Sequence, residues 1–331
     1  MQAAVFYPAG VKTRSTTMGP YVIDAASGAV MSPGAFPLIA LSHGSGGNCW
    51  DLHDFATYLA SRGFVVACVN HPGDNFQDHS GLGTDRVLIG RALQMSALID
   101  AMLRDPTLGP HINPSHIGAA GFSAGGYTAL LLAGARPNFD LLNDYCCAYP
   151  KDPEFCTGWR VRITRPDLTL KSDPRVKAIF IMSPVGIYFD RAALAGVHVR
   201  VRLWAAAADA VLPLKANAER IRSLLPRPPE YSVIPNAGHF IFLAPCTQSM
   251  RVRLSAICTD PPGVDRAKIH SLVNADAARF FSSAFGAPEA VREGKKGGRT
   301  NGIPRPILGE RNDTASSMSD FRKDRGASNG R

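Results

Sequence analysis

Five residues near the middle of the chain have the types and spacing of a serine nucleophile. They are Gly121-Phe122-Ser123-Ala124-Gly125, between a short apolar run at 117–120 and an apolar stretch at 127–133. Such a strand–turn–helix context exposes the serine hydroxyl at the top of a sheet, near the positive end of a helix. Glycines suit so tight a turn, because side chains there would collide with the neighbouring strand and helix. The motif indicates acyl transfer by Ser123; the alternative is a glycine-rich turn with an incidental serine.

A serine nucleophile needs a base, and His239 is the best candidate among the nine histidines. Its segment, 236–240, follows a predicted strand at 231–234, and Pro235 to Gly238 have the composition of a loop. A histidine in a loop beyond a strand end can bring its ring over the nucleophile. His116, His198 and His270 lie in ordinary core or surface patterns. His43 and His71 also lie in loops, but they precede Ser123 in the chain and fit other roles better.

The base in turn needs a carboxylate to orient it, and Asp209 has the right position between Ser123 and His239. A predicted strand at 199–206 ends just before it, so Asp209 lies at the edge where open α/β sheets bind ligands. Its role would be to fix the tautomer of His239 and to stabilise the imidazolium. The alternative is an N-cap for a predicted helix at 213–225. The rival acids are Asp173 and Asp190.

The loop His43-Gly44-Ser45-Gly46-Gly47-Asn48 follows an apolar strand predicted at 36–42. Its glycines allow the backbone to approach a ligand and to aim N–H groups at a developing negative charge. We expect an oxyanion hole formed by the backbone amides of Ser45 and Ala124. The alternatives are a flexible glycine loop or a phosphate loop, but the second lacks both the Gly-Lys-Ser/Thr ending and the G-x-G-x-x-G spacing.

His71 and Asp74 follow the predicted strand at 65–70, so they lie at the same edge of the sheet. Either residue could shape the pocket or brace the first loop. We favour a structural role, in which 70–73 form a tight turn and Asp74 bonds to the backbone of that turn. Neither residue is predicted to be catalytic.

Several segments together resemble the α/β-hydrolase superfamily: 36–47, 66–75, 121–126 and 236–240. Within it, the chain is similar to the bacterial proteins called predicted dienelactone hydrolases, which are related to platelet-activating-factor acetylhydrolase. The more family-specific parts are Asn-His-Pro-Gly-Asp at 70–74 and the element formed by Cys246 and 257–266. The resemblance covers about residues 4–285.

This resemblance implies a catalytic triad of Ser123, Asp209 and His239, with Ser45 and Ala124 as oxyanion donors. True dienelactone hydrolases carry cysteine at the nucleophile position, and Ser123 instead favours general carboxylester chemistry. A small-molecule ester is the expected substrate, and the mechanism needs no metal or organic cofactor. The alternatives are a peptidase or amidase of the prolyl-oligopeptidase type, which shares the motif at 121–127 but has a large extra domain, and a non-catalytic binding protein on the same fold.

The composition agrees with an enzyme of this class. Of the 331 residues, 45% are hydrophobic and 19% are charged, as in ordinary globular proteins. Strand-like and helix-like runs alternate from Phe36 onward, which predicts an α/β fold with a mostly parallel sheet and helices on both faces. Predicted helices include 52–61 and 90–103, the second with a buried face formed by Leu93, Ala97, Leu98 and Ala101.

The alternation is interrupted at 137–173, which divides the predicted hydrolase domain of residues 1–285. This insertion carries three cysteines and several aromatic residues and lies before the predicted core strand 176–182, a common position for a small cap over an active site. Its aromatics could line an acyl or alcohol pocket, but a small core of the insertion itself is favoured. They are Phe139, Tyr145, Tyr149, Phe155 and Trp159.

Residues 286–331 are rich in Gly, Ser, Arg and Lys and predict a basic, disordered tail. Part of the net charge of +9 lies there, and the remainder is too dilute over the domain to predict nucleic-acid binding. No apolar run is long enough for a membrane helix.

Seven cysteines are more than a cytosolic hydrolase needs, and their spacings do not match a zinc site. Cys246 could pair with Cys258, and Cys156 could pair with Cys146 or Cys147. Such bridges favour a periplasmic or secreted protein, whereas the first residues lack the features of a signal peptide and favour the cytoplasm. The oligomeric state has no signal in the sequence.

Overall fold

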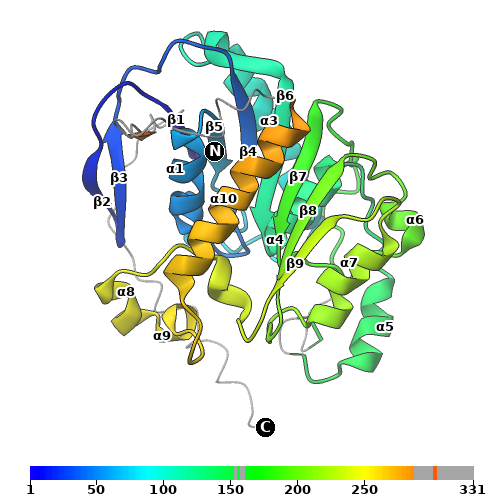
Figure 1. The fold of residues 1–331 in the computed structure, drawn as a ribbon. Helices are drawn as coiled ribbons and strands as arrows, with labels where there is room; N and C mark the ends of the chain where they lie inside the picture. The colour runs from blue at the N-terminus through cyan, green and yellow to red at the C-terminus, as the bar shows by residue number, and fades with distance from the viewer. Residues whose placement is uncertain (153–154, 157–160, 287–300, 304–331) are drawn as a thin grey trace.

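Within the described residues, a mixed sheet of ten strands forms the centre of the molecule (Figure 1). The computed structural model describes residues 1–152, 155–156, 161–286 and 301–303. The strand order is β2-β3-β10-β1-β5-β4-β6-β7-β8-β9. The strands are β1 (Ala3–Pro8), β2 (Arg14–Met18), β3 (Tyr21–Ser27), β4 (Phe36–Ser42), β5 (Val65–Val69), β6 (Ile112–Phe122), β7 (Val176–Met182), β8 (Arg200–Ala206), β9 (Glu230–Ile234) and β10 (Asn301–Ile303).

Helices connect most of these strands. The α-helices are α1 (His53–Ser61), α2 (Asp85–Leu88), α3 (Gly90–Arg104), α4 (Ala124–Leu132), α5 (Leu141–Ala148), α6 (Arg191–Leu194), α7 (Ala218–Leu224), α8 (Gln248–Arg253), α9 (Ser255–Cys258) and α10 (Arg266–Ala284). The short 3-10 helices are η1 (Cys49–Leu52), η2 (Gly109–His111), η3 (Leu214–Ala216) and η4 (His239–Phe242).

The strands from β5 to β9 run parallel, as the alternating sequence pattern predicts. These strands are apolar because helices cover both of their faces. One core lies between the sheet and α1 and α10, and Figure 1 shows α10 crossing that face. The other core lies between the sheet and α3, α4 and α7. The parallel strands end at one edge, where the loops that follow β4, β5, β6, β8 and β9 come together.

The antiparallel N-terminal part extends the sheet beyond the parallel strands. β1 pairs with β5, and β2 and β3 form a hairpin near the far edge. The excursion formed by α8 and α9 packs on this hairpin, where Tyr21, Ile23, Ala25, Cys246 and Met250 form a small third core. The predicted bridge between Cys246 and Cys258 closes this excursion.

The predicted insertion at 137–173 contains one described helix, α5. A disulfide joins Cys146 to Cys156, which resolves the two pairings left open by the sequence, and Cys147 is free and exposed. Tyr145 contacts both Tyr149 and Phe155, and Phe139 and Phe155 also contact Tyr188 outside the insertion. Trp159 lies outside the described residues.

The buried face predicted for α3 is wrong. Arg91, Met95, Leu98, Ile99 and Met102 are among its buried residues, whereas of the four residues predicted only Leu98 is buried. The observed buried face of α3 differs from the predicted one because alanine accepts either environment. In addition, the side chain of Arg91 points inward to the buried carboxylate of Asp74. The predicted helix at 213–225 is also divided, into η3 and α7.

Within the predicted tail, the structure describes Gly286 and the strand β10. β10 pairs antiparallel with β1 and parallel with β3. Residues 287–300 and 304–331 lie outside the described residues, so the prediction of disorder for them stays a prediction.

Candidate active site

Ser123 lies on a sharp turn between β6 and α4. Its backbone is in an unusual conformation, with φ 56° and ψ −119°. A Cβ on Gly121 would overlap the backbone of Gly125, and a Cβ on Gly125 would overlap the carbonyl oxygen of Ser42. Both glycines are therefore required by close backbone approach, as the sequence predicts. The turn places the serine hydroxyl at the N-terminus of α4, where the helix dipole is positive.

The structure brings Ser123 together with His239 and Asp209, the two partners predicted for it. The Nε2 atom of His239 lies 3.0 Å from the Oγ atom of Ser123. The Nδ1 atom of His239 lies 2.7 Å from the Oδ2 atom of Asp209. All three residues are buried, with exposed fractions of 9%, 5% and 7% for Ser123, His239 and Asp209. The hydroxyl, imidazole and carboxylate form one continuous hydrogen-bonded chain.

Asp209 is held by the loop that follows β8. Its Oδ1 atom accepts hydrogen bonds from the amides of Val211 at 3.0 Å and Leu212 at 2.7 Å, which leaves Oδ2 for the histidine. The rival acids have other partners. Asp190 caps α6 by accepting from the amide of Ala193, and Asp173 pairs with Arg175.

The glycine loop after β4 lies directly against the turn that carries Ser123. A Cβ on Gly44 would approach the ring of Phe122 to 3.1 Å and the Cβ atom of Ser123 to 3.7 Å. Ser45 and Ala124 line the same cavity as Ser123. Within the described residues the amide of Ser45 donates to no acceptor, and the amide of Ala124 is at the first position of α4, where a helix offers none.

The tight turn predicted at 70–73 is present, and the amide of Asp74 donates to the carbonyl oxygen of His71 at 3.1 Å. The side-chain contacts of Asp74 differ from the preferred prediction. Its carboxylate accepts from the hydroxyl of Ser45 and the amide of Gly46, in the first loop, and not from its own turn. The alternative, that it braces that loop, has the right geometry. Its other partner is Arg91, which sequence reasoning missed. The signal that could have indicated this pair is an arginine on the buried face of a helix.

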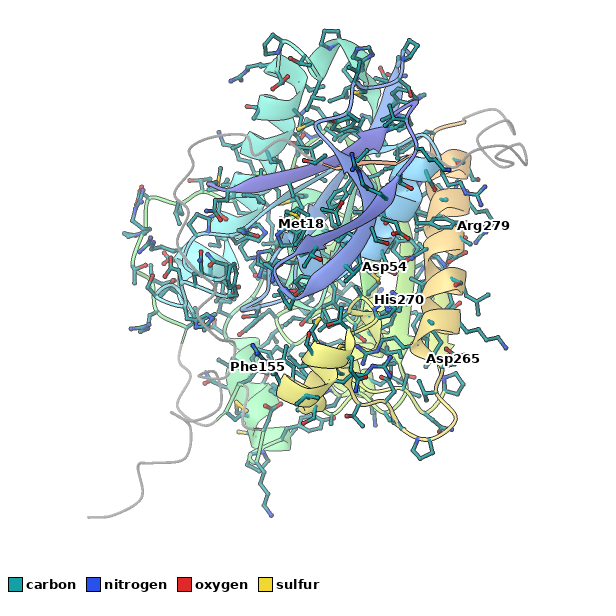
Figure 2. The ribbon with its side chains drawn as sticks, turned by 90° about the vertical axis from the view of Figure 1, so that its left-hand side faces the viewer. Met18, Asp54, Phe155, Asp265, His270 and Arg279 are labelled. Carbon is teal, nitrogen blue, oxygen red and sulfur yellow. A yellow bond between two sulfur atoms is a disulfide. The ribbon has the colours of Figure 1, made fainter. Side chains whose placement is uncertain are left out.

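A cavity of about 90 Å³ opens beside Ser123. Apart from the polar residues already described, its walls are apolar: Leu82, Val87, Leu88, Phe155, Val185, Tyr188, Val211 and Leu212 are among the residues that line it. Phe155 belongs to the predicted cap insertion, and Figure 2 labels it in the lower part of the view. A larger cavity of about 270 Å³ lies between α5 and η3 and contains none of the predicted site residues.

Within the part of the chain that the structure describes, no cluster of three or more His, Cys, Asp or Glu side chains is arranged to hold a metal ion. No described helix combines the length and apolar character that a membrane crossing requires.

Comparisons with known proteins agree with this architecture. Residues 7–85 match the model of the family described as platelet-activating factor acetylhydrolase, isoform II. The chain is 40% identical over 78 residues to Lipase 1 of Moraxella sp. (strain TA144). It is also similar in structure to a ferulic acid esterase from Streptomyces cinnamoneus, with a TM-score of 0.56 and 20% identity over 83% of this chain and 76% of the other.

These similarities cover different shares of the chain. The match to the Moraxella lipase spans 24% of this chain and only 21% of the lipase. The family match contains Ser45 and Asp74 but ends before Ser123. The likeness to the Streptomyces esterase covers most of both chains and, at its low identity, shows a common fold.

Proposed function

We propose that this chain, which has the α/β-hydrolase fold, is a serine esterase that cleaves carboxylic esters through an acyl-enzyme. The observation that carries the proposal is the hydrogen-bonded series from Ser123 through His239 to Asp209 at the N-terminus of α4. The named relatives, a lipase and an esterase, support ester hydrolysis as the reaction class.

In the proposed mechanism, Ser123 attacks the ester carbonyl while its hydroxyl proton passes to Nε2 of His239. The carbonyl oxygen becomes an oxyanion and accepts hydrogen bonds from the amides of Ser45 and Ala124. Collapse of the tetrahedral intermediate breaks the ester bond, and His239 gives its proton to the leaving alcohol. A water molecule then attacks the acyl-enzyme, again with His239 as base, and releases the acid and Ser123.

The substrate is proposed to be small on the side that enters the cavity. A cavity of about 90 Å³ is well below the volume of about 300–1,000 Å³ that is typical of pockets for drug-sized ligands. Its apolar walls favour a short aliphatic acyl or alcohol group. We therefore propose that acetyl to butyryl esters are better substrates than long-chain esters.

The experiment is hydrolysis of p-nitrophenyl esters of increasing acyl length by the wild-type chain and Ser123→Ala. The variant is expected to lose several orders of magnitude in kcat. Ser115→Ala is a matched control, because Ser115 is an exposed serine on the same strand, β6. Wild-type rates in Ser123→Ala would refute the proposed nucleophile.

The alternatives have distinct readouts. A peptidase or amidase would cleave a peptide p-nitroanilide at a rate comparable to that of the ester. A non-catalytic binding protein would hydrolyse neither. The intact hydrogen-bonded series favours an enzyme over the binding protein.

A further inference from the structure

A buried ion pair contacts the glycine loop at residues 43–48, here called the oxyanion loop, and borders the cavity that opens beside Ser123. The Nη1 atom of Arg91, on α3, is 2.7 Å from the Oδ2 atom of Asp74, in the loop after β5, and the two side chains are only 2% and 1% exposed. A buried ion pair loses much of its attraction to desolvation, so stability alone is a weak reason for it. Its contacts indicate another reason.

Asp74 ties the far end of the oxyanion loop to α3. While Oδ2 faces Arg91, its Oδ1 atom accepts from the amide of Gly46 at 2.7 Å and from the hydroxyl of Ser45 at 2.8 Å. Burial acts to raise the pKa of the Asp74 carboxyl, but the charge of Arg91 and the bond from Gly46 outweigh it and hold the pKa below its ordinary range. The group is therefore a carboxylate at neutral pH, able to accept all three contacts.

Arg91 ties the near end of the same loop. Its Nη2 atom donates to the hydroxyl of Ser42 at 3.1 Å and also to the carbonyl oxygen of His43. One arginine and one aspartate therefore fix residues 42, 43, 45 and 46, on both sides of Gly44. This leaves the loop little freedom to rotate the peptide between Gly44 and Ser45.

The orientation of that peptide decides where the amide of Ser45 points. The carbonyl oxygen of Gly44 accepts from the amide of Gly47 at 3.2 Å and faces Nδ1 of His43 at 2.7 Å. In a trans peptide the N–H and C=O groups point in opposite directions. The Ser45 amide therefore points away from these two partners, and within the described residues it has no acceptor.

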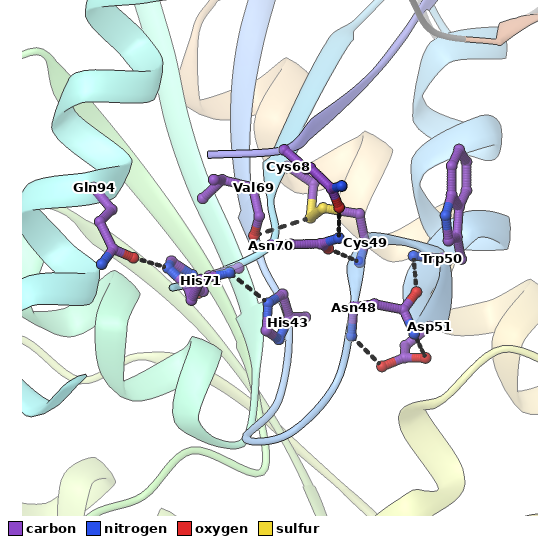
Figure 3. The surroundings of a disulfide bond; sticks show 12 residues. His43, Asn48, Cys49, Trp50, Asp51, Cys68, Val69, Asn70, His71 and Gln94 are labelled. Atoms are coloured by element: carbon purple, nitrogen blue, oxygen red, sulfur yellow. Dashed lines mark hydrogen bonds between the residues drawn. A yellow bond between two sulfur atoms is a disulfide. The ribbon is translucent and has the colours of Figure 1, made fainter. Parts of the chain in front are cut away.

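The two buried histidines around the pair complete the network (Figure 3). Burial, and next to it the charge of Arg91, lowers the pKa of both His43 and His71, so each ring is neutral. A neutral His43 can donate from Nδ1 to Gly44 while its Nε2 accepts from the amide of His71 at 3.1 Å. His71 likewise donates from Nδ1 to Gln94 and accepts from Ser42. Each contact thus has one donor and one acceptor.

We infer that Asp74 and Arg91 are positioning residues that hold the Ser45 amide in the geometry required to stabilise the oxyanion. The inference rests on the proposed function. The oxyanion exists only in the transition state and the tetrahedral intermediate, so a misplaced donor should lower kcat and leave KM nearly unchanged. The pair acts through the loop and makes no contact with the reacting atoms.

The experiment compares Asp74→Asn, Arg91→Met and Arg91→Lys with wild type on p-nitrophenyl acetate. Rates are normalised to the active sites titrated with diethyl p-nitrophenyl phosphate, so that misfolded molecules do not lower kcat. Asp74→Asn turns an amide donor toward Arg91 or toward the loop, and kcat should fall on the order of 100-fold, as expected for a displaced catalytic group. Arg91→Lys keeps the charge beside Asp74 and should retain more kcat than Arg91→Met.

A second readout separates positioning from a general structural role. A trifluoromethyl ketone forms a tetrahedral adduct with Ser123 that needs the same two amides, and its inhibition constant should rise in parallel with the fall in kcat/KM. Arg175→Met is the matched control. Arg175 also pairs with an aspartate of α3, Asp100, but it has no contact with the loop, so its kcat should be unchanged.

Ser45→Ala keeps the test decisive if Asp74→Asn does not fold. The Ser45 side chain is exposed, and its loss removes one of the two loop contacts of Asp74. A fall in kcat of about fivefold is expected from one such hydrogen bond. Unchanged kcat and inhibition constant in this variant would overturn the inference.

The failures of the inference and of the proposed function differ. If Ser123→Ala is inactive but Asp74→Asn keeps kcat within about twofold, the inference alone fails. A rise in KM at unchanged kcat also overturns it, because Asp74 and Arg91 would then contribute to substrate binding from the cavity wall. Full activity in Ser123→Ala overturns the proposed function itself.

Discussion

Asp209 uses its two carboxylate oxygens for different contacts. One oxygen accepts from the amides of Val211 and Leu212, and the other faces Nδ1 of His239. The first pair of contacts fixes the carboxylate, so that the second can fix the tautomer of the imidazole. An amide of the same shape could keep the first contacts and lose the second, because its nitrogen would turn a donor toward the N–H of the histidine.

We expect Asp209→Asn to fold and to lose activity. In a serine triad the wrong histidine tautomer lowers kcat by about 10⁴-fold. The measurement is kcat on p-nitrophenyl acetate, with the free energy of unfolding from urea denaturation as a check on folding. Asp190→Asn is the control, because Asp190 caps α6 and has no triad contact, so that variant should keep kcat. Equal kcat in the two variants would contradict the assignment of Asp209.

The sequence was sufficient to predict that Ser123, His239 and Asp209 meet, because the chemistry of a serine nucleophile restricts the order and position of its partners. Asp209 and His239 each follow a strand of the parallel sheet, and parallel strands end at one edge. Arg91 was not predictable in the same way. Its partner, Asp74, comes from another loop, and only the packed structure shows that the two meet beneath the Ser45 loop.

At the scale of elements, the insertion predicted at 137–173 supplies one wall of the proposed substrate cavity. Phe155 lines the cavity, and its ring lies 6.0 Å from that of Tyr145 and 6.3 Å from that of Tyr188. The disulfide between Cys146 and Cys156 ties this segment to α5. The position of Phe155 therefore limits the group that the cavity can hold.

We expect Phe155→Ala to widen the acyl range. Removing the ring enlarges the cavity, so the ratio of kcat/KM for p-nitrophenyl octanoate to that for the acetate should rise about tenfold or more, since each buried CH₂ contributes about 0.8 kcal/mol. Phe139→Ala is a matched control from the same insertion, because Phe139 contacts Tyr188 but does not line the cavity. An unchanged ratio in Phe155→Ala would show that this wall does not set specificity.

A second contact between elements supports η4, which begins with His239. His270, on α10, lies with Nδ1 2.6 Å from the Asp54 carboxylate of α1 and with Nε2 2.8 Å from the carbonyl oxygen of Ile241 in η4. Figure 2 shows Asp54 and His270 beside each other. Both partners are acceptors, so only the protonated imidazolium can donate to both.

The stability that His270 contributes should therefore depend on pH. Burial acts to lower the pKa of His270, but Asp54 and the Ile241 carbonyl outweigh it, and also the repulsion from Arg266, and raise the pKa above 6.5. A pKa that is raised by folding gives a contribution that is complete below the unfolded pKa and is lost as the pH rises through the folded pKa. Burial likewise acts to raise the pKa of Asp54, but His270 and His53 lower it, so the carboxylate stays ionised throughout.

We expect His270→Gln to reduce the free energy of unfolding most at about pH 5.5, by about 1.5–3 kcal/mol, as for hydrogen bonds to charged groups. The difference from wild type should decrease toward about pH 9, as the imidazolium of the wild type loses its proton. Urea denaturation across this range measures it. His198→Gln is the control, since His198 is exposed. A difference that is constant with pH would show that folding does not raise the pKa of His270.

Elements were predictable where hydrophobic runs were continuous. β4 and β7 have the predicted bounds, because buried strands of a parallel sheet leave no choice of face. The buried face of α3 was not predictable, because the alanines at 97 and 101 suit either side of the helix. The buried Arg91 also has a charged partner, Asp74, from a loop that is distant in the sequence.

At the scale of the whole molecule, three disulfides lie in three separate regions of the fold. Cys146–Cys156 lies within the insertion predicted at 137–173, and Cys246–Cys258 closes the α8–α9 excursion. Cys49–Cys68, which the sequence did not predict, joins η1 to β5 beside the glycine loop at 43–48 (Figure 3). Its partners are 19 residues apart with no local motif between them, so only the pairing of β4 with β5 brings them together. Disulfides of this number point to an extracellular or periplasmic location.

The pairing makes a countable prediction, because six of the seven cysteines are bonded and Cys147 is free and exposed. Protein from an oxidising compartment, unfolded in guanidinium chloride, should contain one thiol that reacts with 5,5′-dithiobis(2-nitrobenzoic acid). The Cys147→Ser variant should contain none. After reduction, all seven cysteines of the wild type should react. Reduction should also lower the free energy of unfolding, since loops of this size contribute about 2–4 kcal/mol each. Cys147→Ser should keep the wild-type stability. More than one thiol in the unreduced protein would show that a disulfide is absent, and peptide mapping would identify which one.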